Sequence, residues 1–174
     1  MKSVQFDENL NAKHLRLACS SEGLVTPIAF PSHLKSKSDP DVLAALIPEN
    51  NLIVTLDRGF IEDHASDVPD SHGGVLVVEQ DVHTVGTMTS HRAQKILADF
   101  KKSCPDWHIR DWRNSIICLS QSLIEISHVS SGSIERDGSI IDRTAAGWRD
   151  LFLKSLAENA ARTPPNGEAS VVTA

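Results

Sequence analysis

The chain has 174 residues, of which 40% are apolar and 23% are charged, so it can bury the core of one domain and is not wholly disordered. No apolar run approaches the roughly 20 residues of a membrane span, and residues 1–10 carry acidic side chains instead of an apolar signal segment, so we expect neither membrane insertion nor secretion. The formal net charge of −6 argues against a dedicated nucleic-acid binder. Residues 82–114 carry 6 basic against 3 acidic side chains, which could form a phosphate-binding stripe or could be a chance division of scattered surface charge.

The first part of the chain predicts, in order, a strand, a helix, a second strand and a polar loop over residues 3–6, 10–21, 25–30 and 32–38. A helix over residues 38–46 is the best marked, because a capping Ser or Asp precedes proline in its first turn. Two apolar, β-branched runs at 52–56 and 75–78 are typical of strands buried on both faces. This alternation predicts an α/β doubly wound sheet.

The second part predicts an amphipathic helix over residues 89–102. Apolar runs at 115–120 and 123–129 predict a hairpin. The Ser- and Gly-rich stretch 130–142 predicts a turn or a mobile connection, and residues 143–161 predict a last helix.

The predicted elements divide the chain into three parts. We expect a domain over residues 1–129, a connection with a C-terminal helix over residues 130–162, and a disordered tail over residues 163–174. Three cysteines at wide spacing, without a CxxC pair, exclude a disulfide framework and a thiolate zinc site, and they favour the reducing cytoplasm.

Three acidic residues fall at or beside the predicted carboxyl ends of the strands. Asp7 follows the first strand, Asp57 follows the buried strand at 52–56, and Asp39 begins the helix that leads into that strand. In open parallel sheets, ligands bind outside the carboxyl ends of the strands. Converging carboxylates repel one another unless a cation neutralises them, and oxygen ligands of this kind select Mg²⁺ or Mn²⁺. Such a metal can activate water against a phosphodiester.

Each of these acids also has a purely structural explanation. Asp39 can cap its helix, and Asp57 can be a turn residue. Asp7 and Glu8 can complement the dipole of the helix that follows them. The conjunction of the three positions is what indicates a site.

Three segments resemble motifs of the PIN-like domain family, in the family's order: FDENL at residues 6–10, SDPDVLA at 38–44 and IVTLDRGF at 53–60. The resemblance is closest to the compact branch related to the ribonuclease toxins of bacterial toxin–antitoxin pairs, and it covers about residues 3–80, with a weaker continuation to about 129. It implies a three-layer α/β/α sandwich with a central, mostly parallel sheet, here followed by a C-terminal helix. It also implies hydrolysis of RNA phosphodiester bonds with Mg²⁺ or Mn²⁺.

The resemblance assigns roles to individual residues. It makes Asp7, Asp39 and Asp57 the metal-binding catalytic acids. The neighbouring polar residues that would orient them are Asn9, Thr55 and Glu8.

The sequence departs from the family at residue 59. Gly59 stands where the family usually has a further acid, so one ligand is missing. Glu62 or Asp63 could substitute one turn later, and we take Asp63 as the additional metal ligand. If neither reaches the site, the second cation is weakly held or absent.

Several basic residues are candidates for contact with RNA. Arg58 could bind the scissile phosphate, although pairing with a nearby carboxylate is favoured. Arg92 and Lys95 could follow the RNA backbone, or they could belong to a solvated helix face. Trp107 and Trp112 could stack on unpaired bases, or they could anchor the core.

The sequence thus predicts a metal-dependent endoribonuclease whose partners are RNA, a small antitoxin-like protein and a second copy of the chain. One alternative is a PIN-like module without catalysis that binds RNA or a protein. Another is a phosphoacceptor receiver domain, which would need a hydroxyl after the strand at 75–78 and a Lys-Pro pair further on. Glu79 follows that strand, and the chain contains no Lys-Pro pair, so this alternative ranks last.

Overall fold

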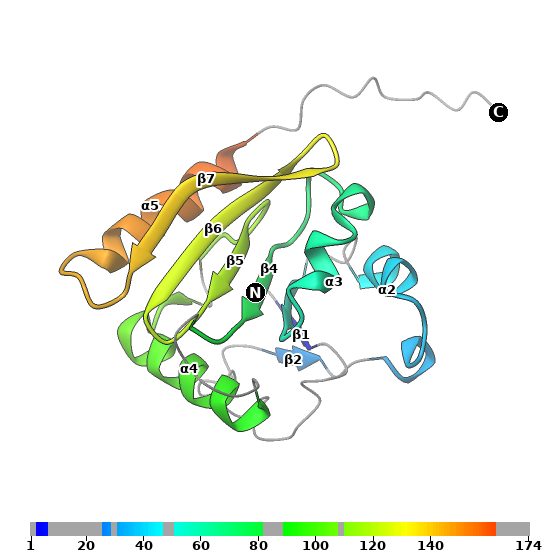
Figure 1. Ribbon diagram of the computed structural model, residues 1–174, viewed down its shortest axis with the longest axis horizontal. Helices are drawn as coiled ribbons and strands as arrows, with labels where there is room; N and C mark the ends of the chain where they lie inside the picture. The colour runs from blue at the N-terminus through cyan, green and yellow to red at the C-terminus, as the bar shows by residue number, and fades with distance from the viewer. Residues whose placement is uncertain are drawn as a thin grey trace.

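A computed structural model describes residues 3–6, 26–28, 31–46, 51–81, 89–107 and 110–162. In chain order its elements are β1 (Ser3–Phe6), β2 (Thr26–Ile28), the 3-10 turn η2 (Ser32–Leu34), α2 (Asp39–Leu46), β3 (Leu52–Thr55), α3 (Gly59–Glu62), the 3-10 turn η4 (Ala65–Asp67), β4 (Val75–Val78), α4 (Ser90–Ser103), β5 (Ile116–Leu119), β6 (Leu123–Ser130), β7 (Ser133–Asp142) and α5 (Trp148–Ala161) (Figure 1).

The strands form one sheet in the order β2-β1-β3-β4-β5-β6-β7. The first five strands in this order, β2, β1, β3, β4 and β5, are parallel, whereas β6 and β7 are antiparallel to their neighbours. The chain passes from β1 to β2 on one side and then to β3 on the other, so the strand order reverses at β1, which is where doubly wound sheets bind ligands. Phe6 pairs with Val54, so β1 and β3 end at the same edge of the sheet. We call the edge formed by the ends of β1, β3, β4 and β5 the carboxyl edge.

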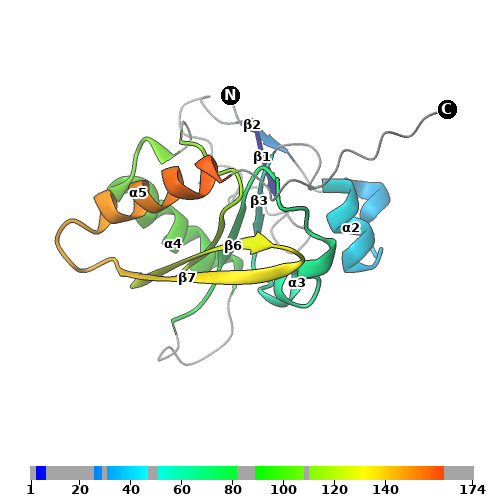
Figure 2. The ribbon, with the colours of Figure 1, turned by 90° about the horizontal axis from the view of Figure 1, so that it is seen from above.

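Helices cover both faces of the sheet. Figure 2 shows α4 and α5 on one side of the strands and α2 and α3 on the other. Alternate residues of β3 divide between the two cores: Leu52 and Val54 pack toward α4 and α5, whereas Ile53 packs toward α2 and α3. This arrangement confirms the α/β/α sandwich with a mostly parallel sheet and a C-terminal helix.

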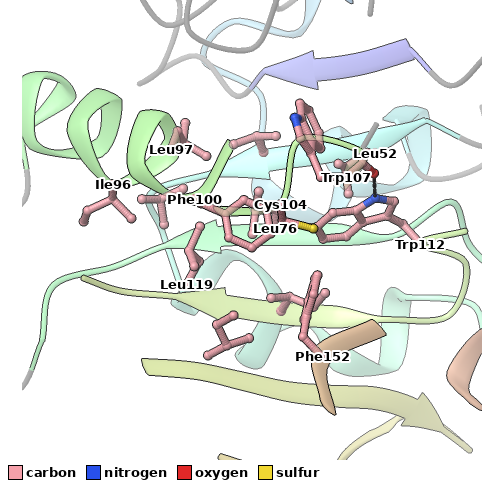
Figure 3. Packing of buried hydrophobic residues seen from close by; sticks show 14 of the residues in the cluster. Leu52, Leu76, Ile96, Leu97, Phe100, Cys104, Trp107, Trp112, Leu119 and Phe152 are labelled. Atoms are coloured by element: carbon pink, nitrogen blue, oxygen red, sulfur yellow. Dashed lines mark hydrogen bonds between the residues drawn. The ribbon is translucent and has the colours of Figure 1, made fainter. Parts of the chain in front are cut away.

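The larger core contains the aromatic residues of the chain's second half (Figure 3). The rings of Trp107 and Trp112 meet edge to face at 6.2 Å, and Phe152 meets Trp112 at 5.9 Å. Trp112 Nε1 donates to the backbone oxygen of Trp107 over 2.8 Å. Both tryptophans are buried, at 4% and 1% exposure, so they anchor the core instead of offering a stacking surface.

Most of the predicted elements are confirmed, including the fully buried strands β3 and β4 and the hairpin of β5 and β6. Helix α4 also begins as its sequence indicates, because Thr89 accepts a hydrogen bond from the Arg92 amide over 3.3 Å. The loop predicted over residues 32–38 contains one 3-10 turn, which buries Leu34. The helix predicted over residues 10–21 and the tail predicted over residues 163–174 lie outside the described residues.

The prediction of a turn or mobile connection over residues 130–142 is wrong. Ten of these residues form β7, which pairs with β6 and extends the sheet. The turn itself is confined to Ser131 and Gly132, whose φ angles are 51° and 76°. The β-branched Ile134 and Ile141 pack against opposite cores, and this alternation outweighs the Ser and Gly content.

The last helix starts later than residue 143. Gly147 has φ 77° and precedes α5 at Trp148. Phe152 and Leu156 of α5 are buried in the larger core. Helix α5 therefore shares its core, and β7 its sheet, with the residues before 130. Within the described ranges, no helix has the length and hydropathy needed to cross a bilayer.

Candidate functional site

Asp57 lies at the carboxyl edge, two residues after the end of β3. Its backbone amide donates to Thr55 Oγ1 over 3.0 Å, and its Oδ1 accepts from the Phe60 amide over 3.3 Å. Thr55 is fully buried, whereas Asp57 is exposed. The buried hydroxyl of Thr55 therefore fixes the turn that presents the Asp57 carboxylate to solvent.

Asp57 and Asp63 point toward the same position, that of the missing side chain of Gly59. A Cβ atom on residue 59 would lie 3.2 Å from Asp57 Oδ1 and 3.1 Å from Asp63 Oδ2. Both acids are exposed, and the single turn of α3 separates them along the chain. The absent side chain thus leaves a small space between two carboxylate oxygens that solvent can reach.

Asp39 is the first residue of α2, on the same face of the sheet as α3. Its Oδ2 lies 3.8 Å from Nε2 of His64, the residue that follows Asp63. Nδ1 of the same imidazole lies 3.8 Å from Asp67 Oδ2. His64 therefore links the acid of α2 to the segment that carries Asp63. Because α2 begins at Asp39, the capping position before the helix belongs to Ser38 and not to Asp39.

Asp7, Glu8 and Asn9 lie outside the described residues, although β1 ends one residue before Asp7 at the edge where Asp57 follows β3. Asp39, Asp57 and Asp63 do not, among themselves, bring three ligand atoms within 4.8 Å of one another.

Arg58 is the centre of a network of ion pairs, which confirms that it pairs with carboxylates. Its Nε lies 2.7 Å from Glu62 Oε1. Its two terminal nitrogens lie 3.2 Å from Glu79 Oε2 and 3.0 Å from Glu125 Oε2. Arg136 of β7 contacts Glu62 at 2.9 Å and Glu125 at 3.1 Å. Sequence reasoning missed Glu125 and Arg136, although an ionisable residue inside the apolar run 123–129 is a signal of this kind.

The described residues contain one group of three potential metal ligands within 4.8 Å of one another, namely Glu79, Cys118 and Glu125. The guanidinium of Arg58 already binds both carboxylates of this group. Burial, followed by the charge of Glu79, raises the pKa of the Cys118 thiol to about 12, so the thiol stays protonated at neutral pH. The cation at this position is therefore the side chain of Arg58.

Burial also raises the pKa of Glu79, and Arg58 opposes that effect only in part. Burial would raise the pKa of Glu62 as well, but the hydrogen bonds and charges of Arg58 and Arg136 together outweigh burial, so the pKa is lowered. Glu62 is thus an ionised partner of Arg58 and Arg136. Of the two acids that could replace the missing ligand at residue 59, Asp63 is the one that faces the site.

The two basic residues proposed for RNA lie on α4. Arg92 Nη1 donates to Gln80 Oε1 over 3.1 Å, which places this guanidinium beside the end of β4 at the carboxyl edge. Lys95 lies one turn further along α4 and is exposed.

No protein-family model matches the sequence, and neither the curated proteins nor the solved structures contain a match to the chain. The likeness to the PIN-like family therefore stays a prediction from the three motifs.

Proposed function

We propose that the protein is a Mg²⁺- or Mn²⁺-dependent ribonuclease whose metal is held by Asp57 and Asp63, together with Asp7 and Asp39. The convergence of the Asp57 and Asp63 oxygens on the space above Gly59 carries this proposal. Carboxylate oxygens suit both cations, which bind one or two carboxylates per ion and complete their coordination with water. Solvent reaches both acids, so neither the ion nor an RNA strand needs an opening in the fold.

The surrounding residues have separate tasks in this reaction. Thr55 and the Phe60 amide fix the Asp57 turn, so the carboxylate is oriented before the substrate arrives. Arg92 and Lys95, on the helix that starts at the carboxyl edge, would bind phosphates away from the cleaved bond. A bound Mg²⁺ or Mn²⁺ would polarise the phosphate of the substrate and lower the pKa of a coordinated water molecule.

A second candidate is a module of the same fold that binds RNA or a protein without cleaving. Glycine in place of an acid at residue 59 favours it, because the site then has one ligand fewer. The receiver alternative shares the strand order β2-β1-β3-β4-β5. However, Glu79 follows β4 and Ser120 follows β5, so the hydroxyl and the lysine that such a domain needs are not in place.

The decisive experiment measures cleavage of unstructured, fluorescently labelled RNA by the purified protein with Mn²⁺. We expect Asp57→Asn and Asp63→Asn each to lower the rate by about 100-fold, because each removes one charged metal ligand. Asp150→Asn, at an exposed acid on α5, serves as the matched control and should keep the full rate. Chelation of the metal should abolish cleavage. Equal rates for the wild type and Asp57→Asn would refute the ribonuclease, and metal binding without cleavage would favour the second candidate.

A further inference from the structure

We propose that Glu125 and Arg136, on the hairpin of β6 and β7, are positioning residues that hold Asp57 and Asp63 in place through Arg58 and Glu62. This inference rests on the proposed function, because it concerns the same two acids. It assigns a role in metal binding to a hairpin that lies far from the three predicted motifs along the sequence.

The two acids flank a very short helix. Asp57 and Arg58 precede α3, whereas Glu62 is its last residue and Asp63 follows it. Three backbone hydrogen bonds of 2.9 to 3.2 Å close this turn, donated by the amides of residues 61, 62 and 63. A helix of this length has no stability of its own, so contacts with the rest of the fold must hold it.

Two kinds of contact hold α3. Phe60 and Ile61 are buried against the sheet and fix the depth of the turn. The ion pairs act at its two ends, because Arg58 stands directly before the helix and Glu62 at its end. The apolar contacts attach the helix, whereas the ion pairs at both ends determine how its flanking acids are aimed.

The ion pairs close into a ring of alternating charge. Arg58 contacts Glu62 at 2.7 Å, Glu62 contacts Arg136 at 2.9 Å, Arg136 contacts Glu125 at 3.1 Å, and Glu125 contacts Arg58 at 3.0 Å. We call these four residues the ion-pair ring. Within the ring each member has two partners of opposite charge, so the loss of any one breaks two of the four pairs of the ring. Networks of this kind contribute where isolated surface pairs contribute little.

The ring joins the ends of α3 to the strands β6 and β7. Glu125 of β6 pairs in register with Cys118 of β5, its side chain is only 19% exposed, and both of its oxygens accept from Arg58. Arg136 of β7 pairs in register with Ser127 of β6, and its Nε reaches Glu125 Oε1 over 3.1 Å. The sheet therefore provides the fixed reference against which α3 is aligned.

The test uses Glu125→Gln and Arg136→Gln, which remove one charge each while leaving the candidate metal ligands unchanged. Binding of Mn²⁺ alone is followed by the electron paramagnetic resonance signal of the free ion. We expect each variant to raise the dissociation constant about 10-fold, as the loss of residues that orient metal ligands does. The double variant should show little further loss, because both changes break the same ring.

Amide hydrogen exchange reports how firmly α3 is held, and it can be measured without any metal. We expect exchange at the amides of Glu62 and Asp63 to accelerate about 10-fold in both variants, while exchange at Val77 in β4 stays unchanged. Arg113→Gln is the matched control, since it breaks an exposed arginine pair with Asp111 before β5 and should alter neither reading. Arg136→Lys keeps the charge but lacks the forked guanidinium that bridges two carboxylates, so we expect it to behave like Arg136→Gln.

The outcomes separate the two proposals. Unchanged exchange at Glu62 and Asp63, or accelerated exchange with unchanged Mn²⁺ affinity, overturns the positioning role of the ring. A wild-type protein that binds no Mn²⁺ overturns the proposed function instead, and the exchange rates then decide alone whether the ring holds α3.

Discussion

Gly59 leaves open the space toward which Asp57 and Asp63 both point, and this is the smallest feature on which the candidate site depends. A methyl group there would approach both oxygens to 3.1–3.2 Å, which is tighter than ordinary van der Waals contact. Because both acids are exposed, their side chains can turn away from the methyl group without disturbing the core.

We therefore expect Gly59→Ala to weaken Mn²⁺ binding about 10-fold while the thermal midpoint changes by no more than a few degrees. Calorimetric titration with Mn²⁺ and a thermal melt measure the two effects. Ala65→Ser, a small change in the nearby turn η4, is a suitable control. Unchanged affinity in Gly59→Ala would show that the ion, if bound, does not lie between these two oxygens.

At the scale of single elements, α5 is joined to the segment between α4 and β5 by charged hydrogen bonds. Arg149 Nη2 donates to Asp106 Oδ1 over 2.7 Å, and Arg110 contacts the other oxygen of the same carboxylate. The hydrogen bond from Arg149 is the main reason that the pKa of Asp106 lies well below its ordinary value of 3.8. A lowered pKa means that the folded state favours the ionised acid, so this stabilisation is complete above about pH 4 and is lost as the pH falls further.

Asp106→Asn should accordingly lower the free energy of unfolding by about 1–3 kcal/mol at pH 7, since it removes hydrogen bonds to a charged group. The variant should also lose less stability than the wild type between about pH 4 and pH 2. Urea unfolding at several pH values measures both effects. Asp99→Asn, which breaks an exposed pair with Lys102, should leave the curve almost unchanged. A wild-type pH profile retained in Asp106→Asn would contradict the assignment.

Some elements can be predicted from residues near in sequence, and others depend on remote residues. The strands β3 and β4 are local apolar runs, and α4 has its cap and its buried stripe in one segment, so nearby residues suffice to predict them. The strand β7 is different, because its Ser and Gly residues resemble a loop until pairing with β6 is considered. For α3, the residues that hold it are remote: Glu125 lies 67 positions from Arg58 along the chain. No local pattern encodes that contact, so the ion-pair ring could not be predicted.

The residues of the candidate site likewise include some that the sequence predicts and some that it does not. Asp57 is predictable because it follows a buried apolar run, and the pairing of Arg58 with a carboxylate follows from the excess of acids around it. The choice of Asp63 over Glu62 depends on the direction of two neighbouring side chains, which the sequence does not contain.

At the scale of the whole molecule, the C-terminal helix is part of the main core. Phe152 is fully buried and meets Phe100 of α4 at 5.5 Å and Trp112 at 5.9 Å. Asn159, also buried, donates to the Ser127 backbone oxygen of β6 over 3.3 Å. Since α5 shares its contacts with α4 and the sheet, the described parts of the chain should unfold together.

We expect Phe152→Ala to lower the free energy of unfolding by about 3–5 kcal/mol, as the removal of a buried aromatic ring does. Circular dichroism of the helices and fluorescence of the buried tryptophans should report the same transition in the wild type and in the variant. Leu151→Ala, at the exposed neighbouring position, is the control and should change stability by less than about 1 kcal/mol. Two separate transitions would show instead that α5 folds as an independent appendage.

If the protein binds RNA as proposed, the ion pairs of Arg58 also affect how the carboxyl edge meets that strand. The chain as a whole is acidic, and a phosphate strand that nears the carboxyl edge would meet Glu62, Glu79 and Glu125 as repelling charges. The two guanidinium groups that bind these three carboxylates cancel most of that repulsion with covalently attached counterions. Unlike a bound metal, these counterions cannot be diluted or chelated away, so the neutralisation of these three carboxylates is independent of the supply of divalent ions.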